Sequence, residues 1–191
     1  MQETSFYSKK ELLQLGFKSI GTRNLQISRF ARFYGIDKMT IGNNVRIDDF
    51  AILSGNITLG NHVHIGAYSA LYGKFGIEME DFTGISPRTT VFSATDDFSG
   101  DYLISPMVPE KYTNVTGGKV IIQKFSQIGA GTIIMPSLTI EEGVTVGAMS
   151  FIRKNLIAWH IYAGIPAKKI KPRQKKCIEL ANFFISSDNN A

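Results

Sequence analysis

The chain of 191 residues is 43% hydrophobic and 19% charged, with a net charge of +5 at pH 7. This length and balance predict one domain, residues 1–191, with a buried core, and they exclude a disordered or collagen-like chain. A single cysteine, Cys177, excludes a disulfide framework and a cysteine-rich zinc site, and favours a reducing compartment, which we take to be the cytoplasm.

The first part of the chain, 1–40, predicts a helix followed by an irregular first coil or cap. Ser8 and Glu11 have the spacing of a capping box, and Gly16 follows as a helix stop. The polar N-terminus lacks a signal-peptide core, and the uncharged stretch 50–73 contains too many polar side chains to cross a bilayer. We therefore expect no integral membrane association.

From residue 41 onward an aliphatic residue recurs at every sixth position. The first run consists of Ile41, Ile47, Leu53, Leu59, Ile65, Leu71 and Ile77. A second run is shifted by two and consists of Met79, Ile85 and Val91, and a third consists of Ile122, Ile128, Ile134, Ile140, Val146 and Ile152. A period of six fits neither a helix nor a heptad, but as a multiple of two it lets every leading aliphatic face inward from a short strand.

The hexads predict stacked turns around one aliphatic column. The small residue that often follows the aliphatic, such as Gly42 or Gly60, is expected to supply backbone freedom at the corner. The alternative, an ordinary sandwich, is disfavoured because its strands recur every 8–12 residues.

The phase is lost at about residues 93–119, which predicts an extruded loop. A non-periodic segment of this length in a compact repeat protein is usually functional. The loop contains Asp96, Asp97 and Tyr112.

The last third of the chain carries three short motifs and a cluster of positive charge. The motifs are Ile-Gly-Ala-Gly-Thr at 128–132, Val-Gly-Ala-Met-Ser at 146–150 and Tyr-Ala-Gly-Ile-Pro-Ala-Lys at 162–168. Residues 153–176 contain eight basic side chains and no acidic one. This cluster predicts a local polyanion site, for cofactor phosphates, nucleic acid or an anionic membrane surface.

The hexads and the three motifs resemble those of the hexapeptide-repeat acyltransferases, which include N- and O-acetyltransferases of sugars and nucleotide sugars. The resemblance covers about residues 41–173. It implies an all-β fold, a left-handed parallel β-helix of about five coils at 41–157, with short helical caps. The basic C-terminal cap, 158–191, is expected to place a helix at about 175–185 over the exposed end of the β-helix. A homotrimer with sites between subunits is also implied.

The resemblance also implies a groove for an acyl-CoA co-substrate. Its expected contacts are Gly129, Ala130, Gly147, Ala148, Lys168 and Arg173, the last two of which would meet the phosphates. Small residues let the pantetheine approach the backbone, and the N–H of Gly129 or a neighbour is expected to hold the thioester oxygen as charge develops.

The sequence departs from the family at its usual catalytic histidine, because Thr95 is followed by Asp96. A sugar hydroxyl needs a strong general base to attack a thioester, and an aspartate of pKa about 4 is a weak one. An amine needs less help, since its unprotonated fraction is already nucleophilic. We therefore predict transfer of a short acyl group, most simply acetyl, to the amine of a nucleotide-linked amino sugar for surface polysaccharide.

In this prediction Asp96 orients and deprotonates the amine, and Ser86, Asp97 and Tyr112 are candidate sugar contacts. The nearest alternative is O-acetylation of a hydroxyl, with His160 or Asp96 as the base.

Two further alternatives belong to other classes. A hydratase of the γ-carbonic-anhydrase kind needs three histidines converging on one metal, which the positions of His62, His64 and His160 do not suggest. A scaffold whose basic tail binds nucleic acid or membrane is disfavoured because the tail has few aromatic residues for base stacking. We expect neither a metal nor a nucleic-acid partner.

Overall fold

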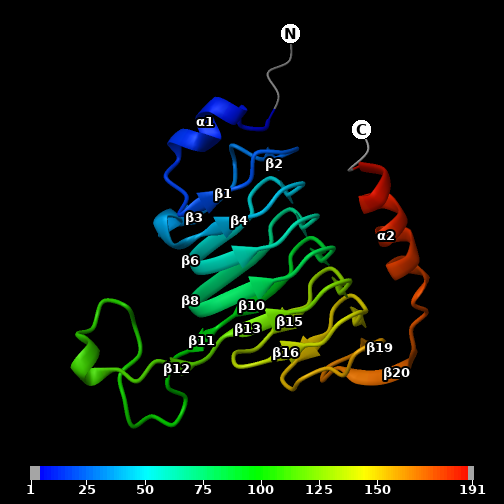
Figure 1. Ribbon diagram of the computed structural model, residues 1–191. Helices are drawn as coiled ribbons and strands as arrows, with labels where there is room; N and C mark the ends of the chain where they lie inside the picture. The colour runs from blue at the N-terminus through cyan, green and yellow to red at the C-terminus, as the bar shows by residue number, and fades with distance from the viewer. Residues whose placement is uncertain (1–4, 189–191) are drawn as a thin grey trace.

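Short strands, most of them two or three residues long, follow the hexads and stack in parallel through the computed structural model, which describes residues 5–188 (Figure 1). The outer ends of the predicted segments 1–40 and 158–191, residues 1–4 and 189–191, lie outside this range. Hydrogen-bonded pairing arranges the strands on three faces, as expected for a β-helix.

Each face is a ladder of strands from successive coils. The first face contains β2 (Gln26–Ile27), β5 (Arg46–Ile47), β7 (His64–Ile65), β9 (Gly84–Ile85), β14 (Gln127–Ile128), β17 (Thr145–Val146) and β19 (His160–Ala163). The second face contains β3 (Arg32–Tyr34), the first parts of β6 (Ile52–Leu59) and β8 (Ala70–Met79), β10 (Thr90–Phe92), β15 (Ile133–Ile134) and β18 (Phe151–Ile152). The third face contains β1 (Ser19–Ile20), β4 (Thr40–Ile41), the second parts of β6 and β8, β13 (Val120–Ile122) and β16 (Thr139–Ile140).

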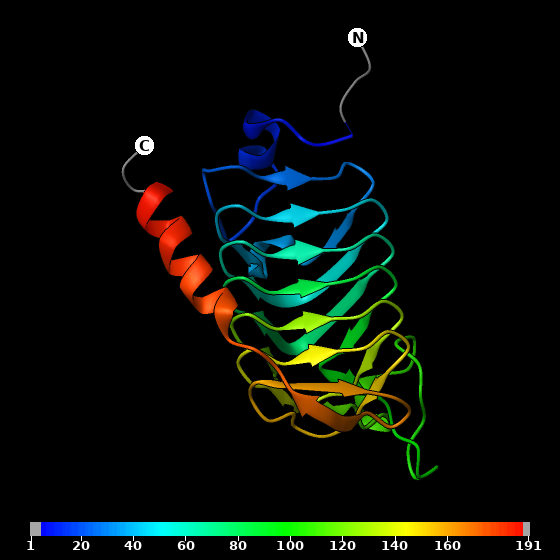
Figure 2. The same ribbon diagram turned by 90° about the vertical axis from the view of Figure 1, so that its right-hand side faces the viewer.

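The coils turn in a left-handed sense from the N-terminal to the C-terminal end of the stack (Figure 2). In the described part of the chain, seven parallel strands stack on the first face, so the stack is somewhat longer than the five coils that the clean hexads indicate. Residues 19–34 account for part of this difference, because β1, β2 and β3 already pair with the first regular coil.

The leading aliphatics form the predicted internal column. Ile47, Ile65 and Ile85 are in direct register on β5, β7 and β9, and all three side chains are fully buried. One position differs from the prediction, since Ile77 pairs with Ile57 rather than with Leu59. The cause is a bulge between Gly55 and Ile57 that absorbs the two-residue shift, so Met79 takes the position that the repeat assigned to Ile77.

The glycine that follows the aliphatic has a different role from the one we predicted. The left-handed corner conformation falls later in the hexad, on residues such as His62 (φ 58°) and Tyr68 (φ 60°). Gly66 is needed for a steric reason, because a Cβ there would lie 2.6 Å from the backbone nitrogen of Pro87 in the next coil. Small residues at this position therefore allow close stacking of coils rather than bending of the chain.

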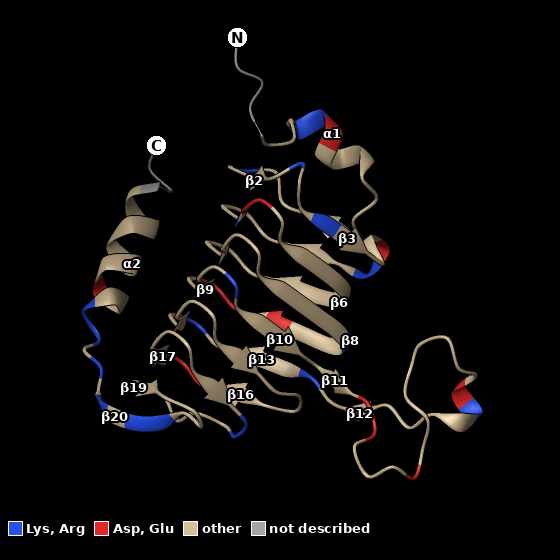
Figure 3. Ribbon diagram, turned by 180° about the vertical axis from the view of Figure 1, so that it is seen from behind, with Lys and Arg blue, Asp and Glu red and all other residues tan. Residues whose placement is uncertain are grey.

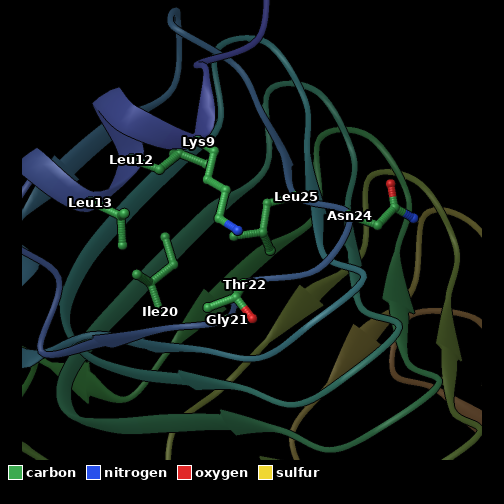
Figure 4. Close-up of a pocket in the computed structure, with 8 residues that line it drawn as sticks. All are labelled: Lys9, Leu12, Leu13, Ile20, Gly21, Thr22, Asn24 and Leu25. Atoms are coloured by element: carbon green, nitrogen blue, oxygen red, sulfur yellow. The ribbon is translucent and has the colours of Figure 1, made fainter.

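The N-terminal helix α1 (Lys9–Gln14) forms as the capping box predicts. The backbone N–H of Ser8 donates to Glu11 Oε2 at 2.8 Å, and Gly16 follows the helix at φ 87°. Hydrogen bonds from Arg29 and then from Ser8 lower the pKa of Glu11 to about 2. Leu12 is buried, and a cavity of about 100 Å³ separates the helix from the first coil (Figure 4). A short 3₁₀ turn, η1 (Ile36–Lys38), leads into the regular repeat.

The C-terminal helix α2 (Lys176–Asp188) forms close to its predicted range but in a different place. It runs back along one side of the stack rather than over its end (Figures 1 and 2). The reason is a column of rings at the corner between the third and first faces, where His62 and Phe82 stack at 4.5 Å and Phe184 of α2 meets His62 edge-on. The end of the stack is closed instead by β20 (Lys168–Pro172), which pairs antiparallel with β19.

The predicted loop leaves the stack after β10 and projects away from it (Figure 1). Its base is a two-stranded ribbon of β11 (Ala94–Thr95) and β12 (Thr116–Gly117), and it contains the 3₁₀ turn η2 (Glu110–Tyr112). Among residues 5–188, no helix is long and apolar enough to span a bilayer.

Replacing Ile65 by alanine tests the internal column. We expect the free energy of unfolding to fall by about 2–5 kcal/mol, because the cavity would lie between two fixed coils that cannot close on it. Guanidinium unfolding at one fixed protein concentration measures the change, with Ile157→Ala, a 56% exposed isoleucine, as the matched control. Equal stability of the two variants would contradict the assignment of Ile65 to the column.

Candidate functional site

Asp96 lies at the base of the loop, where its side chain is exposed to solvent. Just before it, the buried Ser93 accepts a hydrogen bond from the Phe75 N–H at 2.9 Å and donates to the Tyr72 carbonyl at 3.0 Å, which ties the ribbon to the stack. Asp96 itself is exposed, and no group among residues 5–188 donates a hydrogen bond to its carboxylate. This carboxylate is therefore available to accept a proton from a bound molecule.

Two other predicted loop residues have local roles. Asp97 accepts hydrogen bonds from the Gly100 N–H and the Ser99 hydroxyl, both at 2.9 Å. Partial desolvation acts to raise the pKa of Asp97, but these hydrogen bonds outweigh it and the net shift is downward. Tyr112 lies in η2, within the loop, with the Lys111 ammonium 4.7 Å from its ring centre. In one chain the structure does not bring Tyr112 to Asp96.

Four of the predicted groove residues, Gly129, Ala130, Gly147 and Ala148, share the corner between the first and second faces. Gly129 and Gly147 have packing roles there, because a Cβ on Gly129 would lie 2.5 Å from the nitrogen of Ala148, and one on Gly147 would lie 3.0 Å from the Cβ of Ala163. The Gly129 N–H donates to the Val146 carbonyl at 2.8 Å. It is therefore not free to hold a thioester oxygen, so of the groups that we expected in this role only a neighbour of Gly129 remains.

Within the described part of the chain, the neighbouring alanines have unpaired backbone N–H groups, which Gly129 does not have. Among the described residues, nothing accepts a hydrogen bond from the N–H groups of Ala130 and Ala148, which lie one above the other in successive coils. Two unpaired donors in line along the stack suit a chain of amide carbonyls such as a pantetheine arm.

Positive charge gathers at the C-terminal end of the stack (Figure 3). A cavity of about 220 Å³ is lined there by Arg153, Lys154 and Lys168, together with apolar residues. The sequence assigned Lys168 to the phosphates of the cofactor, whereas Arg153 and Lys154 were included only in the basic run 153–176 that predicts a polyanion site. Three cations around one cavity fit a phosphate-bearing ligand.

Arg173 does not join this cavity. Its Nη1 donates to the carbonyl oxygens of Phe125 at 2.6 Å and Gly143 at 3.0 Å, and the guanidinium lies over Trp159. These contacts fasten the segment before α2 to the corner between the third and first faces. We therefore reassign Arg173 from phosphate contact to structural support.

Ser86 and Asp96 lie in the same coil but at opposite ends of β10, and hence at the two edges of the second face. Ser86 lies before β10, beside Gly129 and Ala130 of the following coil. Its hydroxyl accepts a hydrogen bond from the Gln127 side chain at 3.2 Å. One chain thus presents the groove and the free carboxylate on separate edges.

The histidines are dispersed. His64 pairs with Asp48 at 2.8 Å, and His62 belongs to the ring column under α2. His160 bonds the Ala158 carbonyl through Nδ1 at 2.8 Å, on β19, across the stack from the loop base in one chain (Figures 1 and 3). Within the range 5–188, no three His, Cys, Asp or Glu side chains meet as metal ligands.

Comparison with known proteins gives matches at several levels. Residues 38–73 match the family described as bacterial transferase hexapeptide (six repeats). Over 183 residues the chain is 40% identical to the dTDP-4-amino-4,6-dideoxy-D-glucose acyltransferase of Escherichia coli, covering 94% of this chain and 95% of that protein. It is also 27% identical over 161 residues to a putative lipopolysaccharide biosynthesis O-acetyl transferase of Escherichia coli K12, covering 78% of this chain and 80% of that one.

Among solved structures, AntD, an N-acyltransferase from Bacillus cereus in complex with dTDP and 3-hydroxybutyryl-CoA, superposes with a TM-score of 0.94 at 53% identity. The match covers 98% of this chain and all of that one. AntD variants have been solved with replacements at a serine and at an aspartate ten positions later. Ser86 and Asp96 are separated by the same ten positions.

Replacing Arg173 by alanine tests the reassignment. We expect the free energy of unfolding to fall by about 1–3 kcal/mol, because two carbonyl oxygens lose their donor. Urea unfolding measures the loss, with Lys176→Ala, an exposed cation of the same basic run, as the control. If both variants kept the stability of the unaltered chain, Arg173 would return to the phosphate-binding candidates.

Proposed function

The chain belongs to the hexapeptide-repeat bacterial transferases, and on this basis we propose that it transfers a short acyl group from coenzyme A to the amine of a dTDP-linked amino sugar. The observation that carries the proposal is the exposed Asp96 carboxylate without a partner, at the loop base of a chain that closely resembles N-acyltransferases. The acceptor proposed is a dTDP-4-amino-4,6-dideoxyhexose, the class named for the relatives.

The acyl donor lies along the corner between the first and second faces in this proposal. The N–H groups of Ala130 and Ala148 are the donors for its amide carbonyls. The phosphates belong in the cavity of Arg153, Lys154 and Lys168. The reactive thioester then points toward the N-terminal end of the stack, to the coil that contains Ser86.

The chemistry requires little from the protein beyond orientation and a proton acceptor. The amine nitrogen attacks the thioester carbon, and the carbonyl electrons move onto oxygen. Asp96 accepts the proton that the nitrogen must lose, the C–S bond breaks, and coenzyme A leaves as a thiolate that takes up a proton. A carboxylate is basic enough for this step, because the ammonium formed on attack is far more acidic than a hydroxyl.

O-acylation, the activity named for the Escherichia coli K12 relative, is the second candidate. It requires a base that removes a proton from a hydroxyl. His160 lies across the stack from the loop base, so in one chain Asp96 would have to serve alone. The amine is therefore the better acceptor.

A homotrimer completes the proposed site, because the groove corner and Asp96 stand at opposite edges of the second face. That face exposes the rings of Tyr34 (59%) and Tyr72 (39%), the latter stacked on Phe92, which is apolar surface that association would bury. Use of coenzyme A and a dTDP-sugar fits a cytoplasmic enzyme, whose product we assign to surface polysaccharide.

Asp96→Asn tests the base. We expect kcat to fall by about a hundredfold or more, with coenzyme A affinity unchanged, because the amide keeps the shape but cannot accept the proton. Thiol release with a dTDP-amino sugar measures turnover, with acetyl-CoA and 3-hydroxybutyryl-CoA compared as donors. Asp101→Asn, an exposed aspartate of the same loop, is the control. A kcat close to that of the unaltered enzyme would remove Asp96 from the mechanism.

Lys168→Ala tests the phosphate cavity. We expect KM for acyl-CoA to rise about tenfold, with kcat little changed, because one charge-assisted hydrogen bond is lost. The neighbouring Lys169, which does not line the cavity, gives the control variant Lys169→Ala. The same KM for both variants would place the phosphates elsewhere.

A further inference from the structure

The outward column of the first face contains one unusual pair. Gly84 lies directly above Gln127 in the ladder of β9 and β14. Because Gly84 has no side chain, that of Gln127 occupies its space, and a Cβ on Gly84 would lie 2.6 Å from Gln127 Oε1. The Gln127 amide thereby reaches back to the coil of Ser86.

The contacts of this amide fix its orientation. Its Nε2 lies 3.2 Å from Ser86 Oγ and 3.5 Å from the carbonyl oxygen of Ile128. A carbonyl oxygen can only accept, so the nitrogen must face this side, and Ser86 Oγ receives a hydrogen bond from it. Among residues 5–188, the Ser86 hydroxyl donates to nothing. Its hydrogen is left for a ligand.

The backbone explains why a side-chain donor is required at this level. In the two following coils the corner position is an alanine with an unpaired N–H, Ala130 and Ala148. In the coil of Ser86 the same position is Pro87, which has no N–H. The hydroxyl of Ser86 therefore replaces the missing backbone donor at the thioester end of the groove.

We propose that Gln127 is a positioning residue that holds Ser86 as the hydrogen-bond donor to the thioester oxygen while negative charge develops on it. The inference rests on the proposed function. Gln127 donates to Ser86, Ser86 donates to the oxygen, and no proton leaves either group. Loss of one such donor commonly lowers kcat by about 10²–10³.

A double-mutant cycle tests the chain of contacts. Ser86→Ala is expected to lower kcat about a hundredfold. Gln127→Leu should lower it about tenfold, and the double variant should be no slower than Ser86→Ala, because Gln127 acts only through Ser86. KM for acyl-CoA should stay unchanged in all three variants.

Gln127→Glu gives a signature that a purely structural role would not. The shape is preserved, but the carboxylate accepts the Ser86 hydrogen and withdraws it from the ligand, so kcat should fall below that of Gln127→Leu. Thr145→Val, in the next coil of the same column, is the control and should keep full activity.

Different outcomes test the proposed function and the role of Gln127. No thiol release by the unaltered enzyme with any dTDP-amino sugar would overturn the proposed function itself. An active enzyme in which Ser86→Ala is slow but Gln127→Leu is normal would overturn the inference alone. Effects of the two substitutions that multiply in the double variant would also overturn it.

Discussion

The structure depends on one constraint, which is that each coil must lie flat on the next. Backbone pairing sets Ile47 on Ile65 and Ile128 on Val146, so equivalent residues form straight columns. Inside, the leading residues form a buried aliphatic column, and buried Ser and Thr side chains such as Thr89 and Thr132 recur at another position of the hexad. At the corners, close approach of coils requires small residues such as Gly66. The proposed groove and its hydrogen-bond donors form a further column, on the outer side of the corner between the first and second faces.

This regularity explains what could be predicted. The inward column could be predicted because burial imposes an aliphatic residue at a fixed spacing. The loop could be predicted because it interrupts that spacing. Ile77 was misplaced because a bulge shifts the register without breaking the apolar pattern. The place of α2 was also missed, since it depends on rings such as Phe82 that reach the corner from separate coils.

The site was predictable only where chemistry shows in the residue type. Asp96 was found because it follows a recognisable motif position. The engagement of Arg173 with Phe125 and the loss of the Gly129 N–H to Val146 follow from contacts between distant coils, which no local pattern contains. Arg153 and Lys154 were visible as charge, but their convergence with Lys168 depends on the antiparallel return of β20.

The stacked corners also provide contacts at a constant spacing. Because successive strands of a ladder are about 4.8 Å apart, the equivalent corner positions Pro87, Ala130 and Ala148 mark equal steps along the axis. A linear molecule bound along these positions meets its contacts at intervals of one coil. The distance between its charged end and its reactive end must therefore match the number of coils that separate the two parts of the site. Lengthening such a groove would take an entire extra turn of chain, whereas the loop, at the other edge of the second face, can change in length without altering the stack.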